Sequence, residues 1–102
     1  VNTQRLFITQ AHEKRFYEVL EAYLAKLKPS TGPEDASLWT PMISSKKQEL
    51  FQAVLPQVAN DQGKFIFGGE PQQGAFSKPT FTQDMSNCSE LQQDEIKGPL
   101  FI

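Results

Sequence analysis

An acid-rich segment that runs into a Gly-Pro pair and then into an apolar run most constrains how this chain can fold. Gly98 permits a backbone turn that other residues resist, and Pro99 fixes the backbone angle that follows it. Residues 100–102, Leu-Phe-Ile, are typical of a strand that is buried on both faces in a parallel sheet. An acid held just before such a strand, beside a sharp turn, is well placed to meet a ligand. Residues 92–99 are therefore the first place to look for a binding site.

Two stretches carry the periodicity of amphipathic helices. Residues 10–28 repeat apolar residues at three- and four-residue steps, and a proline follows them. Residues 45–60 form the second stretch, which a capping box of Ser45 and Gln48 is expected to open. Pro56 lies inside its pattern and is expected to kink or shorten the helix, because it removes a backbone hydrogen bond. The two apolar stripes consist of Phe16, Val19, Leu20, Tyr23, Leu24 and Leu27, and of Leu50, Phe51, Val54, Leu55 and Val58.

Short apolar runs between turn residues predict the strands. Residues 5–8 are expected to form a buried strand, and residues 64–67 a strand that a glycine pair ends. Residues 76–82 are extended but interrupted by Pro79, which favours an edge or irregular strand. A short helical turn is expected near residues 89–93. The order strand, helix, helix, strand, extended segment, strand predicts an α/β layer arrangement.

Composition excludes several classes of protein. The 102 residues are 38% hydrophobic and 22% charged, which suits one globular domain with a modest core. A net charge of −2 gives no basic footprint for nucleic acid or an anionic membrane, and no apolar run approaches the roughly 20 residues that span a bilayer. The single cysteine, Cys88, rules out an internal disulfide and favours a reducing compartment, so a cytoplasmic location is expected. The missing initiator Met and the end inside an apolar run suggest an excised fragment.

Residues 94–99, Asp-Glu-Ile-Lys-Gly-Pro, resemble the acid-acid-Ile-Phe-Gly-Pro signature of the NAD(P)-dependent aldehyde dehydrogenase superfamily. Residues 67–70, 74–76 and 79–80 occur in the order and approximate spacing of that family's strand-loop-strand region. Residues 3–8 resemble the strand that follows the family's catalytic cysteine loop. The resemblance covers essentially the whole chain, as one internal slice of a much longer enzyme. It implies an α/β fold that is part of a three-layer, Rossmann-like catalytic domain.

The resemblance also implies a role for single residues of the signature. Glu95 matches the glutamate that binds the ribose next to the nicotinamide of NAD or NADP, by accepting hydrogen bonds from the ribose hydroxyls. The residues alone leave open that Glu95 is a solvated loop acid, and Asp94 matches a structural acid. Lys97 departs from the family, which usually has a phenylalanine there against the nicotinamide end. Because a lysine stem can cover apolar surface while its ammonium reaches solvent or a phosphate, Lys97 joins Glu95 as a cofactor-binding candidate.

No catalytic residue and no metal site are expected within the chain. Aldehyde dehydrogenases work through a cysteine nucleophile, and the resemblance implies that this thiol belongs just ahead of Val1. Cys88 lies in the loop before the signature and is expected to be an ordinary loop thiol. His12, the only histidine, is expected on a solvated helix face. One cysteine and one histidine cannot build a zinc site.

The resemblance implies that the chain is a portion of an NAD(P)-dependent aldehyde dehydrogenase, which oxidises an aldehyde to a carboxylic acid, and that the isolated chain is inactive. Residues 89–92, Ser-Glu-Leu-Gln, resemble the pyrroline-carboxylate (glutamate-semialdehyde) dehydrogenase branch. Lys97 favours an alternative, in which a non-catalytic homologue serves as a structural or oligomerisation domain. An unrelated small α/β domain is the third reading. Self-association into a homo-oligomer is expected, because a fragment would present strand edges and apolar helix surface.

Overall fold

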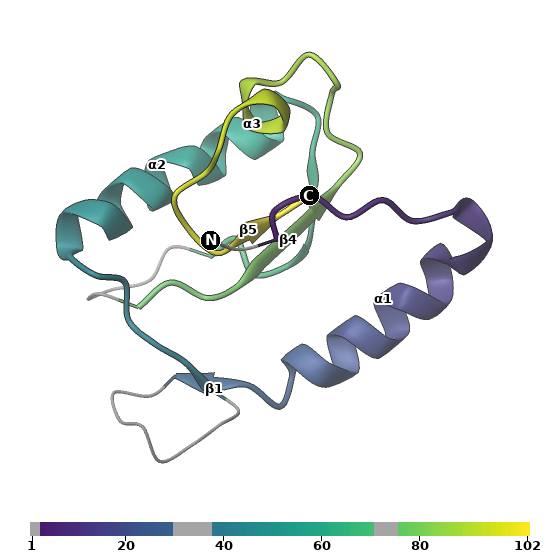
Figure 1. Ribbon diagram of the computed structural model, residues 1–102, viewed down its shortest axis with the longest axis horizontal. Coiled ribbons are helices and arrows are strands. Elements are labelled where there is room, and N and C mark those ends of the chain that lie inside the picture. The colour runs from purple at the N-terminus through teal and green to yellow at the C-terminus, as the bar shows by residue number, and fades with distance from the viewer. Residues whose placement is uncertain (1–2, 30–37, 71–75) are drawn as a thin grey trace.

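The computed structural model describes residues 3–29, 38–70 and 76–102. Its centre is a three-stranded sheet with the order β3-β4-β5, formed by Lys64–Phe67, Thr80–Gln83 and Leu100–Phe101. β4 pairs antiparallel with β3 and parallel with β5, so the sheet is mixed. Figure 1 shows helix α2, Ser45–Asn60, on one side of this sheet and helix α1, Gln10–Leu24, on the other. This is the α/β arrangement that the order of elements in the sequence predicts.

The central strand corrects one prediction. β4 is expected to be an edge or irregular strand because Pro79 interrupts the extended stretch. It is not at an edge, because it lies between β3 and β5, although its register with β3 shifts between Phe65 and Phe67. The strand begins at Thr80, directly after the proline, so the ladder loses no donor. The Thr80 amide instead donates to the Pro99 carbonyl at 2.8 Å, which joins the start of β4 to the turn before β5.

The N-terminal segment differs from a second prediction, that of a buried strand. Residues 5–8 are not a buried strand, because the Phe7 side chain is 96% exposed and its two neighbours are also exposed. The segment nevertheless runs alongside β5. The Ile102 amide donates to the Gln4 carbonyl and the Leu6 amide donates to the Ile102 carbonyl, both at 2.8 Å. This is the slanted pattern of parallel pairing, so the local direction is strand-like although the side chains are not covered.

Helix α2 supplies one side of the core. Its N-cap is Ser44, whose hydroxyl accepts a hydrogen bond from the Lys47 amide at 3.3 Å, so the predicted cap at Ser45 is one residue late. The helix runs through Pro56 to Asn60, and the expected shortening at the proline is wrong. Packing on both sides of the proline holds the helix together, because Leu55 and Val58 are buried. The core cluster consists of Phe51, Leu55, Val58, Met85, Leu91, Ile96 and Leu100.

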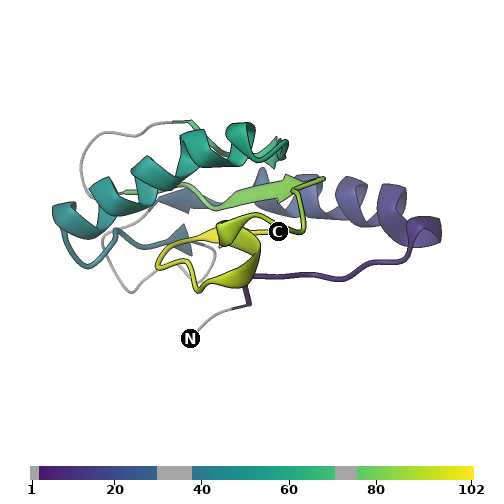
Figure 2. The same cartoon turned by 90° about the horizontal axis from the view of Figure 1, so that it is seen from above.

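Helix α1 lies on the other side of the sheet and is less covered. It ends at Leu24, before the predicted end at residue 28, and Leu24 is its one buried residue. Val19 and Tyr23 of the predicted stripe are 52% and 63% exposed, so the described part of the chain covers this stripe only in part. Figure 2 shows the extended N-terminal segment leading to the far end of α1, which then returns alongside the sheet.

The remaining elements are short. β1, Lys28–Pro29, pairs in parallel with β2, Leu38–Trp39, so residue 28 belongs to a strand and not to the end of the predicted helix. α3, Glu90–Gln93, is the predicted helical turn, capped by the Ser89 hydroxyl, which accepts from the Leu91 amide at 3.1 Å. Residues 74 and 75 of the family-like motif lie outside the described residues. Within the described ranges, no helix has the length and apolar character needed to cross a membrane.

Candidate functional site

Residues 94–99 connect α3 to β5 and carry the signature that the sequence identifies. Ile96 is buried in the core cluster, where Leu91 and Leu100 also lie. Asp94, Glu95 and Lys97 are exposed. One apolar side chain therefore anchors the segment from below, and the charged residues on either side of it remain available to a ligand.

Gly98 is required at this turn for a reason other than the predicted one. The positive-φ glycines in the described part of the chain are Gly68 and Gly69, and Gly98 is not among them. Its position instead lies directly against the ring of Phe51, where an added Cβ would come within 2.8 Å of Cγ. Real Cβ contacts are essentially never this short, so the absence of a side chain lets the segment pass over α2. Close approach, and not a strained backbone, explains the glycine.

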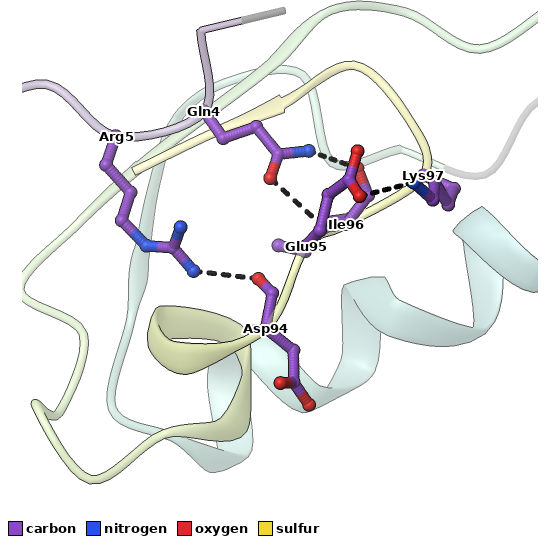
Figure 3. A network of polar contacts seen from close by, with 6 residues as sticks. All are labelled: Gln4, Arg5, Asp94, Glu95, Ile96 and Lys97. Atoms are coloured by element: carbon purple, nitrogen blue, oxygen red, sulfur yellow. Dashed lines mark hydrogen bonds and ion pairs between the residues drawn. The ribbon is translucent and has the colours of Figure 1, made fainter. Parts of the chain in front are cut away.

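Two residues from the start of the chain hold this segment in place, as Figure 3 shows. The Gln4 carboxamide accepts a hydrogen bond from the Ile96 amide at 3.1 Å and donates one to the Ile96 carbonyl. The Arg5 guanidinium donates to the Asp94 carbonyl at 2.7 Å and to the Leu91 carbonyl at 3.2 Å. The backbone on both sides of Glu95 is thus fixed by contacts across more than 85 sequence positions.

Glu95 and Lys97 form an ion pair with each other at the surface. Lys97 lies in a tight turn, in which the Gly98 amide donates to the Ile96 carbonyl at 3.0 Å, and its ammonium meets the Glu95 carboxylate there. The hydrogen bond and the charge of the Lys97 ammonium lower the pKa of the Glu95 carboxyl. Glu95 is therefore a carboxylate at neutral pH, with acceptor oxygens exposed to solvent.

A groove of about 320 Å³ runs between this segment and α2. Lys47, Leu50 and Val54 line it from the helix, and Asp94, Glu95 and Lys97 line it from the segment. Glu90 adds a third carboxylate to those of Asp94 and Glu95. An apolar floor beside three carboxylates and two ammonium groups can accept a flat ring and hydrogen-bond the hydroxyls of an attached sugar. The sequence did not predict the contribution of α2. No sequence signal was available, because Leu50 reads as part of the apolar stripe and its exposure of 56% is visible only in the structure.

A second groove, of about 350 Å³, lies between α1 and the opposite face of the sheet. Phe16 and Tyr17 of α1 line it together with Phe81 and Phe101, whose rings stack at 4.5 Å. Burial, and then the nearby Glu13 carboxylate, raise the pKa of Tyr17. None of the residues predicted to bind the cofactor lies in this groove, so its chemistry does not bear on them.

The single cysteine and the single histidine are both exposed at the surface. Cys88 is exposed in the loop before α3, and its amide donates to the Ser86 hydroxyl at 3.3 Å. His12 is exposed on α1, with its Nδ1 2.7 Å from the Thr9 hydroxyl. In the described part of the chain, no three His, Cys, Asp or Glu side chains gather as they would around a metal ion.

A sequence model described as the aldehyde dehydrogenase family matches residues 1–102, the whole chain. The chain belongs to this family. The glutarate-semialdehyde dehydrogenase of Pseudomonas putida is 28% identical over 100 residues, which cover 98% of the chain and 21% of that enzyme. The 1-pyrroline-5-carboxylate dehydrogenase of Bacillus cytotoxicus is 31% identical over 93 residues, which cover 87% of the chain and 18% of the enzyme.

Solved structures of aldehyde dehydrogenases confirm the predicted fold class. The NAD+ complex of an aldehyde dehydrogenase from Bacillus cereus superposes with a TM-score of 0.81 at 25% identity, over 96% of this chain and 20% of that one. The described residues thus have an α/β fold like that of part of an aldehyde dehydrogenase catalytic domain. The chain spans about a fifth of the length of the curated relatives it matches.

Proposed function

We propose that this chain is the part of an NAD(P)-dependent aldehyde dehydrogenase that supplies one contact to the cofactor, and that residues 1–102 lie within a single catalytic domain. The parent enzyme oxidises an aldehyde to a carboxylic acid. The observation that carries the proposal is the exposed Glu95 carboxylate on the wall of the groove beside α2. Family membership and the NAD+ complex of the similar Bacillus cereus enzyme support it.

The residues of the groove fit NAD or NADP in most respects. The Glu95 carboxylate has two oxygens that can accept hydrogen bonds from neighbouring ribose hydroxyls. Leu50 and Val54 offer an apolar surface to a ring. Lys97 fits as a partner for phosphate or solvent but not as an aromatic neighbour, and its ammonium already pairs with Glu95. The ribose hydroxyls must therefore share the Glu95 carboxylate with Lys97 or displace it.

We propose that the isolated chain has no activity. The exposed Cys88 thiol has no histidine beside it, since the one histidine lies on α1 and bonds to Thr9. The test is an assay of NAD(P)-dependent aldehyde oxidation on purified residues 1–102 and on the full-length parent. Turnover by the parent alone is expected. Turnover by residues 1–102 would contradict the proposal for the chain, and an inactive parent would contradict it for the enzyme.

The proposed substrate is a semialdehyde that carries a carboxylate. Two relatives are a glutarate-semialdehyde dehydrogenase and a 1-pyrroline-5-carboxylate dehydrogenase, and residues 89–92 resemble the second branch. The full-length enzyme should prefer glutarate or glutamate semialdehyde over an unsubstituted aliphatic aldehyde of the same length. Equal kcat/KM values for charged and uncharged aldehydes would remove this assignment.

A second candidate function is a non-catalytic domain that serves structure or oligomerisation. The ion pair between Lys97 and Glu95 favours it, because it engages the carboxylate that the cofactor would need. The residues encoded before Val1 in the parent distinguish the two: a cysteine supports the enzyme, and any other residue there supports the silent domain. Under either reading we propose a cytoplasmic homo-oligomer, which fractionation and light scattering on the parent would test.

A further inference from the structure

The backbone around Glu95 is held by a side chain that no part of the proposed function uses. Gln4 is 9% exposed, and its carboxamide meets both the amide and the carbonyl of Ile96, the residue after Glu95. We infer that Gln4 is a positioning residue: by fixing the peptide groups of Ile96, it sets where the Glu95 carboxylate meets the cofactor. The inference rests on the proposed function, because it concerns the same carboxylate.

A carboxamide of this length is the side chain that suits the task. It carries one acceptor and two donors at its tip, so it pairs with the N–H and the C=O of one residue as a neighbouring strand would. A glutamate at position 4 would keep the acceptor for the Ile96 amide but would bring an oxygen against the Ile96 carbonyl. A leucine would leave the buried Ile96 amide without its Gln4 acceptor, which is unfavourable because water cannot replace that bond there. The Ile96 carbonyl would lose its Gln4 donor but keep the hydrogen bond from the Gly98 amide at 3.0 Å.

Gln4 is itself held in place by other contacts, so its side chain can fix the backbone of residues 95 and 96. Its own carbonyl accepts from the Ile102 amide at 2.8 Å, next to β5. The adjacent Arg5 bonds to the Asp94 carbonyl at 2.7 Å, on the other side of Glu95. The segment is therefore fixed before and after Glu95 by two consecutive residues, as Figure 3 shows. In the described structure the hydrogen bond of the Glu95 side chain goes to Lys97, so Gln4 acts on Glu95 through the backbone.

The test uses the full-length parent and compares Gln4→Leu and Gln4→Glu with the control Gln10→Leu, which changes an exposed glutamine at the start of α1. We expect both Gln4 variants to bind NAD+ about tenfold more weakly, as the loss of one or two buried hydrogen bonds would give. The KM for the cofactor should rise, while the KM for the aldehyde and kcat change less than about twofold. Amide hydrogen exchange should quicken in a peptide that spans residues 94–98 and stay unchanged in α1. The control should match the wild type.

The double variant Gln4→Leu/Glu95→Ala separates a positioning role from a general loss of structure. If Gln4 acts through Glu95, then Gln4→Leu should weaken NAD+ binding little further once Glu95 is alanine. An equal, additional tenfold loss in that background would overturn the inference, as would wild-type affinity in both Gln4 variants. Wild-type affinity of Glu95→Ala alone would overturn the Glu95 contact and, with it, this inference. If Glu95→Ala binds weakly and Gln4→Leu binds normally, the proposed function stands and only the inference fails.

Discussion

Replacement of Gly98 by alanine should destabilise the protein through one identifiable contact. The added Cβ would lie 2.8 Å from Cγ and 2.9 Å from Cε2 of Phe51, inside ordinary van der Waals contact. Phe51 is buried in the core cluster, so its ring cannot turn aside into solvent. Overpacking of this kind costs about 1–3 kcal/mol, and we expect Gly98→Ala to lower the free energy of unfolding by that amount.

The assay is urea denaturation of the full-length parent, monitored by circular dichroism. The free energies of unfolding of the variants are compared only where the slope of free energy against urea concentration is the same. The double variant Gly98→Ala/Phe51→Leu should be more stable than the sum of the two single losses predicts, by about 0.5–3 kcal/mol, because the smaller side chain makes room for the methyl group. Gly98→Ala with wild-type stability would refute the reasoning. Strict additivity of the two losses would show that the methyl group meets something other than the Phe51 ring.

Three further changes test the surroundings of the site. Lys97→Phe should tighten NAD+ binding a few-fold, because it frees the Glu95 carboxylate and adds an aromatic face, whereas weaker binding in a titration would contradict this. Lys97→Met should raise the pKa of Glu95 toward its ordinary range, as followed by carbon NMR; no change would mean that the ion pair does not lower it. Since the folded-state pKa is the lowered one, the small stabilisation from this pair is complete above the unfolded-state pKa and is lost as the pH falls through the folded value. Ser89→Ala should cost about 1 kcal/mol in urea denaturation, because Ser89 caps α3 and bonds to Asp61, and an unchanged midpoint would contradict the cap.

The elements that the sequence predicted well are those whose signals are local. The end of α2 at Asn60, the strand β3 before its glycine pair and the turn of α3 after Ser89 each depend on neighbouring residues. The position of β4 could not be read in this way. The rule that places prolines at sheet edges concerns a donor inside the ladder, and Pro79 lies just outside it. Strand order in a sheet depends on partners that are distant in the chain.

Only the local part of the candidate site could be predicted from the sequence, because its other contacts come from residues distant in the chain. The resemblance identified the segment from Asp94 to Pro99, and Glu95 is exposed, as both a cofactor contact and a solvated loop acid would be. The carboxamide bonds between Gln4 and Ile96 join residues 92 positions apart, so no local pattern could indicate them. Burial of the apolar run at residues 6–8 was wrongly expected, because an apolar pattern shows only that a surface can be covered and not which segment covers it.

The most direct test of the central claim is the affinity of the full-length parent for NAD+ when Glu95 becomes glutamine. Glu95→Gln preserves the size of the side chain but removes the charge that strengthens a bond to a ribose hydroxyl, and such bonds contribute about 1.5–3 kcal/mol. The account predicts a dissociation constant about 10- to 100-fold higher, with the urea midpoint unchanged. An unchanged dissociation constant would contradict the assignment of Glu95 to the cofactor.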